Sequence, residues 1–132
     1  SLLDDCIADL RTDYARPPLG IMVEVPAVAI APELFADAAF FSIGSNDLTQ
    51  YVTAAARDNA AVASLNDSAH PAVTRLIASV CGFGRANNMP VSLCGDMASD
   101  PVHLVSLLNA GVTSLSVAPA RLARIKSALA EI

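Results

Sequence analysis

The chain has 132 residues, of which 54% are hydrophobic and only 5% aromatic, and its mean hydropathy is +0.50. A length near that of one domain and abundant aliphatic material predict one packed unit over residues 1–132, with no internal boundary. The net charge of −5 gives no basic footprint for nucleic acid, and no apolar run approaches the roughly 20 residues of a membrane span.

The three cysteines, Cys6, Cys81 and Cys94, are odd in number and lack paired metal-ligand spacing. The acidic N-terminus also lacks the basic segment of a secretion signal, so we expect a reduced, cytoplasmic protein. Cys6 and Cys81 lie on apolar helical stripes and are predicted to be core residues. The sequence begins without methionine and inside a helical pattern, so we expect the chain to be a piece of a longer protein.

Short apolar runs alternate with helical stripes, and this alternation is typical of a parallel sheet with helical crossovers. Strands are predicted at Leu19–Val25, Ala38–Gly44, Pro90–Cys94 and Ser114–Val117. Helices are predicted at Leu2–Tyr14, at Ala27–Phe35, from Ala72 to Asn87, from Asp100 to Gly111, and through Leu122, Ile125 and Leu129. A polar loop is predicted from Asn46-Asp47 to His70.

This order gives four βα units, which are half of a (β/α)8 barrel of about 250 residues. Four parallel strands alone would leave two open edges. Three alternatives follow: a small open sheet, pairing with another half, or excision from a full barrel.

Acidic and thiol side chains follow three successive predicted strands: Glu24, then Asp47, then Cys94 and Asp96. Because parallel strand ends face one mouth of a barrel, Glu24 and Asp47 could share one metal ion. A lone acid in an apolar strand is costly without a partner, which favours a function for Glu24. The alternative interpretations are a helix cap or an arginine pair for Glu24, and a small hydrophobic core role for Cys94.

Arg57 is the only Lys or Arg between Arg16 and Arg75 and follows Asp47 by ten residues. A carboxylate for Mg2+ and an arginine for phosphate would suit a phosphorylated anion, whereas the alternative is a turn plus a surface arginine. His70 is predicted to cap a helix and His103 to be exposed; neither suits catalysis.

Five stretches together resemble the phosphoenolpyruvate-binding barrel of Enzyme I, the phosphoenolpyruvate–protein phosphotransferase of the sugar phosphotransferase system. They are Gly20–Pro32, Phe40–Asn59, His70–Ile77, Val91–Pro101 and Leu115–Lys126. The sequences QYVTAAARDN and CGDMASDP are more similar to Enzyme I than to pyruvate phosphate dikinase or phosphoenolpyruvate synthase. Three positions depart from the family: Ser45 replaces a common threonine, Asp96 a glutamate, and Asn66 a tyrosine.

The resemblance implies an α/β fold, the C-terminal half of a phosphoenolpyruvate-type TIM (β/α)8 barrel. It implies that Glu24 and Asp47 are Mg2+ ligands and that Asn46 and Asp47 contact phosphoenolpyruvate. Arg57 would hold the phosphate, and Cys94 would protonate the enolate carbon as pyruvate forms.

The resemblance also implies a parent enzyme that moves the phosphoryl group from phosphoenolpyruvate to a protein histidine. The phosphocarrier protein would dock on an N-terminal domain that these residues do not include, so the isolated chain is expected to be inactive. A homodimer is expected, without membrane insertion. The alternatives are a fragment of a dikinase or synthase, or a non-catalytic dimerisation module.

Overall fold

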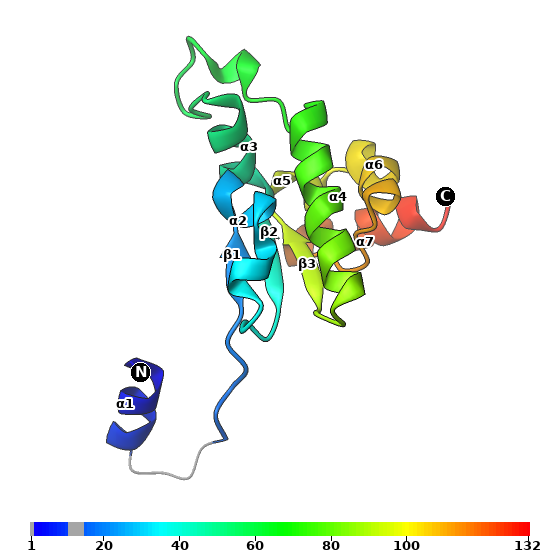
Figure 1. Cartoon of the computed structure of the whole chain (residues 1–132). Helices are drawn as coiled ribbons and strands as arrows, with labels where there is room; N and C mark the ends of the chain where they lie inside the picture. Colours follow the sequence, from blue (N-terminus) through cyan, green and yellow to red (C-terminus); the bar gives the residue numbers. More distant parts are fainter. Residues whose placement is uncertain (1, 11–14) are drawn as a thin grey trace.

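The computed structural model describes residues 2–10 and 15–132 as an α/β structure with a small parallel sheet (Figure 1). The strands are β1 (Ile21–Val23), β2 (Phe41–Gly44) and β3 (Val91–Cys94). The α-helices are α1 (Leu2–Asp9), α2 (Pro26–Ile30), α3 (Ser45–Thr53), α4 (Pro71–Ala86), α5 (Asp96–Ser99), α6 (Leu104–Ala110) and α7 (Pro119–Leu129). Short 3-10 helices are η1 (Pro32–Phe35), η2 (Ala63–Leu65) and η3 (Pro101–His103). In the described part of the chain, no helix combines the length and apolarity needed to cross a bilayer.

The three strands are parallel and lie in the order β1-β2-β3. Successive side chains of a strand point to opposite faces, so each face has its own composition. Val23, Ile43 and Leu93 are fully buried in a core that they share with side chains of α2 and α4. On the opposite face Met22, Ser42 and Ser92 lie in one register row. Met22 is 44% exposed, so this second face is left without a helical cover.

The first three predicted strands form a parallel sheet, as predicted, although each strand is shorter than predicted. The fourth predicted strand, Ser114–Val117, is reduced to one parallel bridge between Leu93 and Leu115. The Leu93 amide donates to the Ser114 carbonyl and the Ser116 amide to the Leu93 carbonyl, each at 2.9 Å. With no neighbour on its other edge among the described residues, this segment forms no ladder, and the four-stranded prediction is not confirmed.

Three predicted helices differ in extent. The helix predicted from Asp100 to Gly111 begins as η3 and continues as α6. The predicted Ala27–Phe35 helix is split into α2 and η1, because Pro32 has no amide hydrogen to continue the ladder and Ala31 leaves the helical region. Of the predicted Leu2–Tyr14 helix, α1 ends at Asp9, and residues 11–14 lie outside the described residues. Cys6 on α1 is exposed, so its prediction as a core residue was wrong, because α1 buries none of its residues.

The predicted polar loop after Asn46-Asp47 was also wrong at its start, because residues 45–53 form α3. The buried face of α3 is largely polar by composition: Ser45, Leu48 and Thr49 are all fully buried. The Thr49 hydroxyl donates to the Ser45 carbonyl at 2.7 Å and the Thr53 hydroxyl to the Thr49 carbonyl at 2.8 Å. These bonds within the helix satisfy the hydroxyl groups, so the face can be buried.

The predicted helix cap at His70 is confirmed, and Asp100 caps η3 in the same way. His70 Nδ1 accepts from the Ala72 amide at 3.1 Å at the start of α4, and Asp100 Oδ1 accepts from the Val102 amide at 3.1 Å at the start of η3. His103, predicted to be exposed, is half-buried instead, because the segment between α3 and α4 packs against it through Ser68.

Candidate functional site

The carboxyl ends of the strands form one row of three residues across the sheet. Gly44 pairs in register with Cys94, and Glu24 directly follows the Val23–Ile43 pair. A methyl group placed on Gly44 would lie 3.0 Å from Glu24 Oε2, so the glutamate side chain leans over the glycine. Gly44 therefore allows the Glu24 side chain to approach the backbone closely at the end of β2, beside Cys94 at the end of β3.

Neither carboxylate predicted to hold a metal ion has a hydrogen-bond or ion-pair partner among the described residues. Glu24 is half-buried after β1, whereas Asp47 is exposed on the first turn of α3. Neither a cap nor an arginine partner for Glu24 is present in the described part of the chain, so the structure gives no support to that alternative. A half-buried carboxylate without a partner is well suited to a cation.

These two carboxylates fit Mg2+, which takes hard oxygen ligands and usually keeps several waters, using one or two carboxylates together with substrate phosphate. No cluster of three or more His, Cys, Asp or Glu side chains with metal-binding geometry occurs within residues 2–10 and 15–132. These residues thus provide no closed cage of protein ligands for a metal ion.

The ends of β2 and β3 are joined by polar contacts of α3. The Ser45 hydroxyl donates to the Cys94 carbonyl at 2.7 Å, and the Asp96 amide donates to Asn46 Oδ1 at 2.9 Å. Gly95 lies between these bonds with φ +99°, a backbone conformation that favours glycine. A Cβ at Gly95 would overlap Ser45 Oγ and lie 2.9 Å from Asn46 Oδ1. The contacts fix the backbone on both sides of Gly95 and hence the place of the Cys94 thiol.

We expect Gly95→Ala to lower the free energy of unfolding by about 3 kcal/mol, since it adds both a strained φ and a steric overlap. Gly82→Ala is the matched control, because a Cβ at Gly82 in α4 meets nothing within 4 Å. This control should raise stability by about 0.5–1 kcal/mol through helix propensity. Denaturant unfolding followed by circular dichroism measures both; equal midpoints for the two variants would contradict the geometry of the Gly95 turn.

Arg57 reaches the site from the segment that follows α3. Its backbone amide donates to Gln50 Oε1 at 3.3 Å, and its Nη2 lies 3.7 Å from Asp96 Oδ2. The side chains of this ion pair are 51% and 84% exposed. Exposed pairs of this kind contribute about 0–1 kcal/mol, so Asp96 holds the Arg57 guanidinium only weakly.

A small cavity of about 140 Å³ lies beside the Arg57–Asp96 pair. Its lining combines the predicted residues Asn46 and Arg57 with four others: Thr49, Asn66, Ser68 and Asp96. The lining is rich in polar groups that can bind an anion. No periodic pattern points to Asn66 or Ser68, and the resemblance marks Asn66 only as a departure from a common tyrosine. Both residues line the cavity because the segment between α3 and α4 folds over it.

The cysteines differ in their surroundings. Cys94 is half-buried at the end of β3, whereas Cys81 is buried in α4, as predicted. Burial raises the pKa of the Cys81 thiol, and the nearby Arg85 guanidinium acts in the opposite direction. Because the raised pKa keeps Cys81 protonated, it is a structural thiol.

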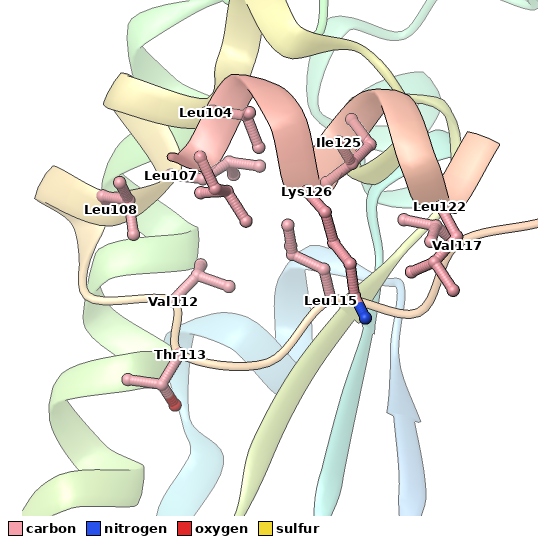
Figure 2. Close-up of a pocket in the computed structure, with 11 residues that line it drawn as sticks. Leu104, Leu107, Leu108, Val112, Thr113, Leu115, Val117, Leu122, Ile125 and Lys126 are labelled. Atoms are coloured by element: carbon pink, nitrogen blue, oxygen red, sulfur yellow. The ribbon is translucent and has the colours of Figure 1, made fainter. Parts of the chain in front are cut away.

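An apolar cavity of about 230 Å³ lies away from these strand ends, between α6, residues 112–117 and α7 (Figure 2). Figure 2 shows leucine side chains of α6 and of residues 112–117 facing it, with Lys126 at its side. Apart from Thr113 and Lys126 its lining residues are all apolar: Leu104, Leu107, Leu108, Val112, Leu115, Val117, Leu122, Ile125 and Leu129. Such a lining supplies packing rather than the convergent polar groups that an anionic substrate needs.

Carboxylates, a thiol and an arginine at the carboxyl ends of parallel strands are typical of α/β proteins that bind a small ligand there. Residues 7–132 match the family described as PEP-utilising enzyme, PEP-binding domain. The chain therefore belongs to the family of phosphoenolpyruvate-utilising enzymes and matches the family's phosphoenolpyruvate-binding domain.

Relatives at similar identity agree with this family. The chain is 43% identical to the Multiphosphoryl transfer protein of Xanthomonas campestris pv. campestris, over 98% of this chain and 16% of that protein. It is 40% identical to the Phosphoenolpyruvate-dependent phosphotransferase system protein of Escherichia coli, over 91% of this chain and 16% of that protein. It is 42% identical to the Phosphoenolpyruvate-protein phosphotransferase of Haloferax volcanii, over 87% of this chain and 20% of that protein. The chain thus spans a fifth or less of the length of these relatives.

Proposed function

We propose that this chain is the phosphoenolpyruvate-binding part of a phosphotransferase that moves a phosphoryl group from phosphoenolpyruvate to a protein histidine and releases pyruvate. The observation that carries the proposal is the row of Glu24, Gly44 and Cys94 at the strand ends, with Asn46 and Arg57 linked to the same edge through Asp96. The names of the relatives, which include Phosphoenolpyruvate-protein phosphotransferase, favour this reaction over that of a dikinase or synthase.

In this proposal Glu24 and Asp47 hold Mg2+, which offsets negative charge on the phosphoryl group when it is bound. Asn46 and Asp47 contact phosphoenolpyruvate. The Arg57 guanidinium leaves its ion pair with Asp96 and binds the substrate phosphate. The bridging P–O bond breaks as a P–N bond forms to the acceptor histidine, leaving the enolate of pyruvate. The Cys94 thiol then gives its proton to the enolate methylene carbon, and solvent restores the proton to the thiolate.

We further propose that the chain is one unit, the C-terminal half of a (β/α)8 barrel whose fourth strand is Ser114–Val117. Two features support this. The bridge at Leu115 is parallel and lies beside β3, where the fourth strand belongs. The sheet face that carries Met22, Ser42 and Ser92 lacks a helical cover, as the interior of a barrel would. Missing strands would explain both the bare face and the open edge.

The remaining parts of the proposal concern the whole protein. It would be a cytoplasmic homodimer that receives its histidine acceptor, and docks the phosphocarrier protein, through another domain. Because these residues would supply only part of the phosphate site, the isolated chain would be inactive.

The test uses the full-length protein and phosphoenolpyruvate labelled in its phosphoryl group. We expect the label to appear on a histidine of the protein, with one pyruvate released for each phosphoryl group and no nucleotide required. Onward transfer of the label from the histidine to AMP, rather than to a histidine of a carrier protein, would contradict the proposal in favour of a dikinase or synthase.

A further inference from the structure

We propose that Asn66 is a positioning residue that holds Arg57 in place for the substrate phosphate. The inference rests on the proposed function and adds a residue that the sequence patterns do not point to. The Asn66 side-chain amide Nδ2 donates to the Ala55 carbonyl at 2.6 Å, across eleven residues of sequence. Ala55 lies only two residues before Arg57, so this bond anchors the backbone from which the arginine extends.

The hydrogen bond from Asn66 to Ala55 lies just after the end of α3, where helical hydrogen bonds no longer hold the backbone. Ala54 ends α3 in a left-handed conformation with φ +53°, and the Ala55 amide makes a last bond to the Gln50 carbonyl at 3.2 Å. After Ala55, the Arg57 backbone amide donates a hydrogen bond to Gln50 Oε1 at 3.3 Å. The Asn66 bond therefore restrains the chain at the point where its direction toward Arg57 is set.

The chain that follows Asn66 is tied to the body of the protein two and four residues further on. The Ser68 hydroxyl lies 3.4 Å from His103 Nε2, and the His70 ring caps α4. The hydrogen bond from Asn66 thus connects Ala55 to a segment that itself contacts η3 and begins α4. Asn66 and Ser68 also line the small cavity beside Arg57.

The side-chain contact of Arg57 cannot replace this restraint. Its pair with Asp96 is exposed on both sides and must open when phosphate binds. Bidentate binding of phosphate by arginine depends on the orientation of a planar group, so the backbone must fix where the guanidinium starts. Loss of the hydrogen bond from Asn66 to Ala55 would leave the charge of Arg57 intact but would no longer fix the position from which its guanidinium extends.

The test is calorimetric titration with phosphoenolpyruvate and Mg2+ of the full-length protein whose acceptor histidine is replaced by alanine, so that binding is measured without phosphoryl transfer. Asn66→Ala should raise the Kd for phosphoenolpyruvate about fivefold, the factor set by loss of one ordinary hydrogen bond. In an Arg57→Ala background, titrated at high substrate concentration, Asn66→Ala should cause no further loss, because both changes then act on the same interaction.

Asn87→Ala is the matched control. The Asn87 Nδ2 donates to the Phe83 carbonyl at 2.9 Å, the same kind of bond, but at the end of α4 that precedes β3. It should leave the Kd unchanged. An unchanged Kd in Asn66→Ala, or the same fivefold loss in the Arg57→Ala background, would overturn the positioning role while leaving the proposed function intact. A wild-type protein that does not bind phosphoenolpyruvate would overturn both.

Discussion

Asp47→Ala in the full-length protein is expected to lower the rate of phosphoryl transfer on the order of 1,000-fold, because it removes a metal ligand that offsets transition-state charge. Asp47 is exposed and has no partner among the described residues, so its loss should not change the free energy of unfolding. Glu24→Gln, which keeps the shape of the side chain and removes its charge, should have a similar effect. The rate of pyruvate release measures both.

The metal dependence makes this prediction specific. If the carboxylates hold Mg2+, the variants should require more Mg2+ for their remaining activity, with little change in an unfolding midpoint. Asp37→Ala is the matched control, because Asp37 is an exposed acid in the turn after η1. A wild-type rate and an unchanged Mg2+ requirement in both Asp47→Ala and Glu24→Gln would remove them from the metal site.

Cys94→Ala is expected to slow turnover by about 100- to 10,000-fold, the range for loss of a positioned general acid. The affinity for phosphoenolpyruvate should stay within about twofold of wild type, since the thiol acts only after the phosphoryl group has left. Steady-state pyruvate release and calorimetric Kd values separate the two effects.

Cys6→Ala provides the control for loss of a thiol, because Cys6 is exposed on α1 and has no place in the site. Its turnover should match wild type. Unchanged turnover in Cys94→Ala would show that another group, or solvent, protonates the enolate.

The sheet could be predicted because its strands carry their own signals. The apolar runs ending at Gly44 and Cys94 each precede a turn, and their alternation with helices permits few arrangements other than a parallel sheet. That topology also predicts that Glu24 and Cys94 lie at the same end of the sheet. It does not predict their register across Gly44, because register depends on packing of the whole sheet.

Other parts were missed for identifiable physical reasons. The helix α3 was interpreted as a loop because Ser45, Thr49 and Thr53 look polar in sequence, whereas hydroxyl bonds to backbone carbonyls hide that polarity. The contact of Asn66 with Ala55 spans a segment without periodicity, so no pattern could predict it. Whether Ser114–Val117 forms a strand depends on a second neighbouring strand, and the local sequence carries no information about that neighbour.

The most direct measurement of the central claim is titration with phosphoenolpyruvate of the full-length protein whose acceptor histidine is replaced by alanine, once with Mg2+ and once with a chelator. The account predicts saturable binding with Mg2+, with an affinity lower by about tenfold or more when the metal is removed or when Asp47 is replaced by alanine. Equal affinity with and without Mg2+, in both wild type and Asp47→Ala, would contradict a metal-assisted phosphoenolpyruvate site at these strand ends.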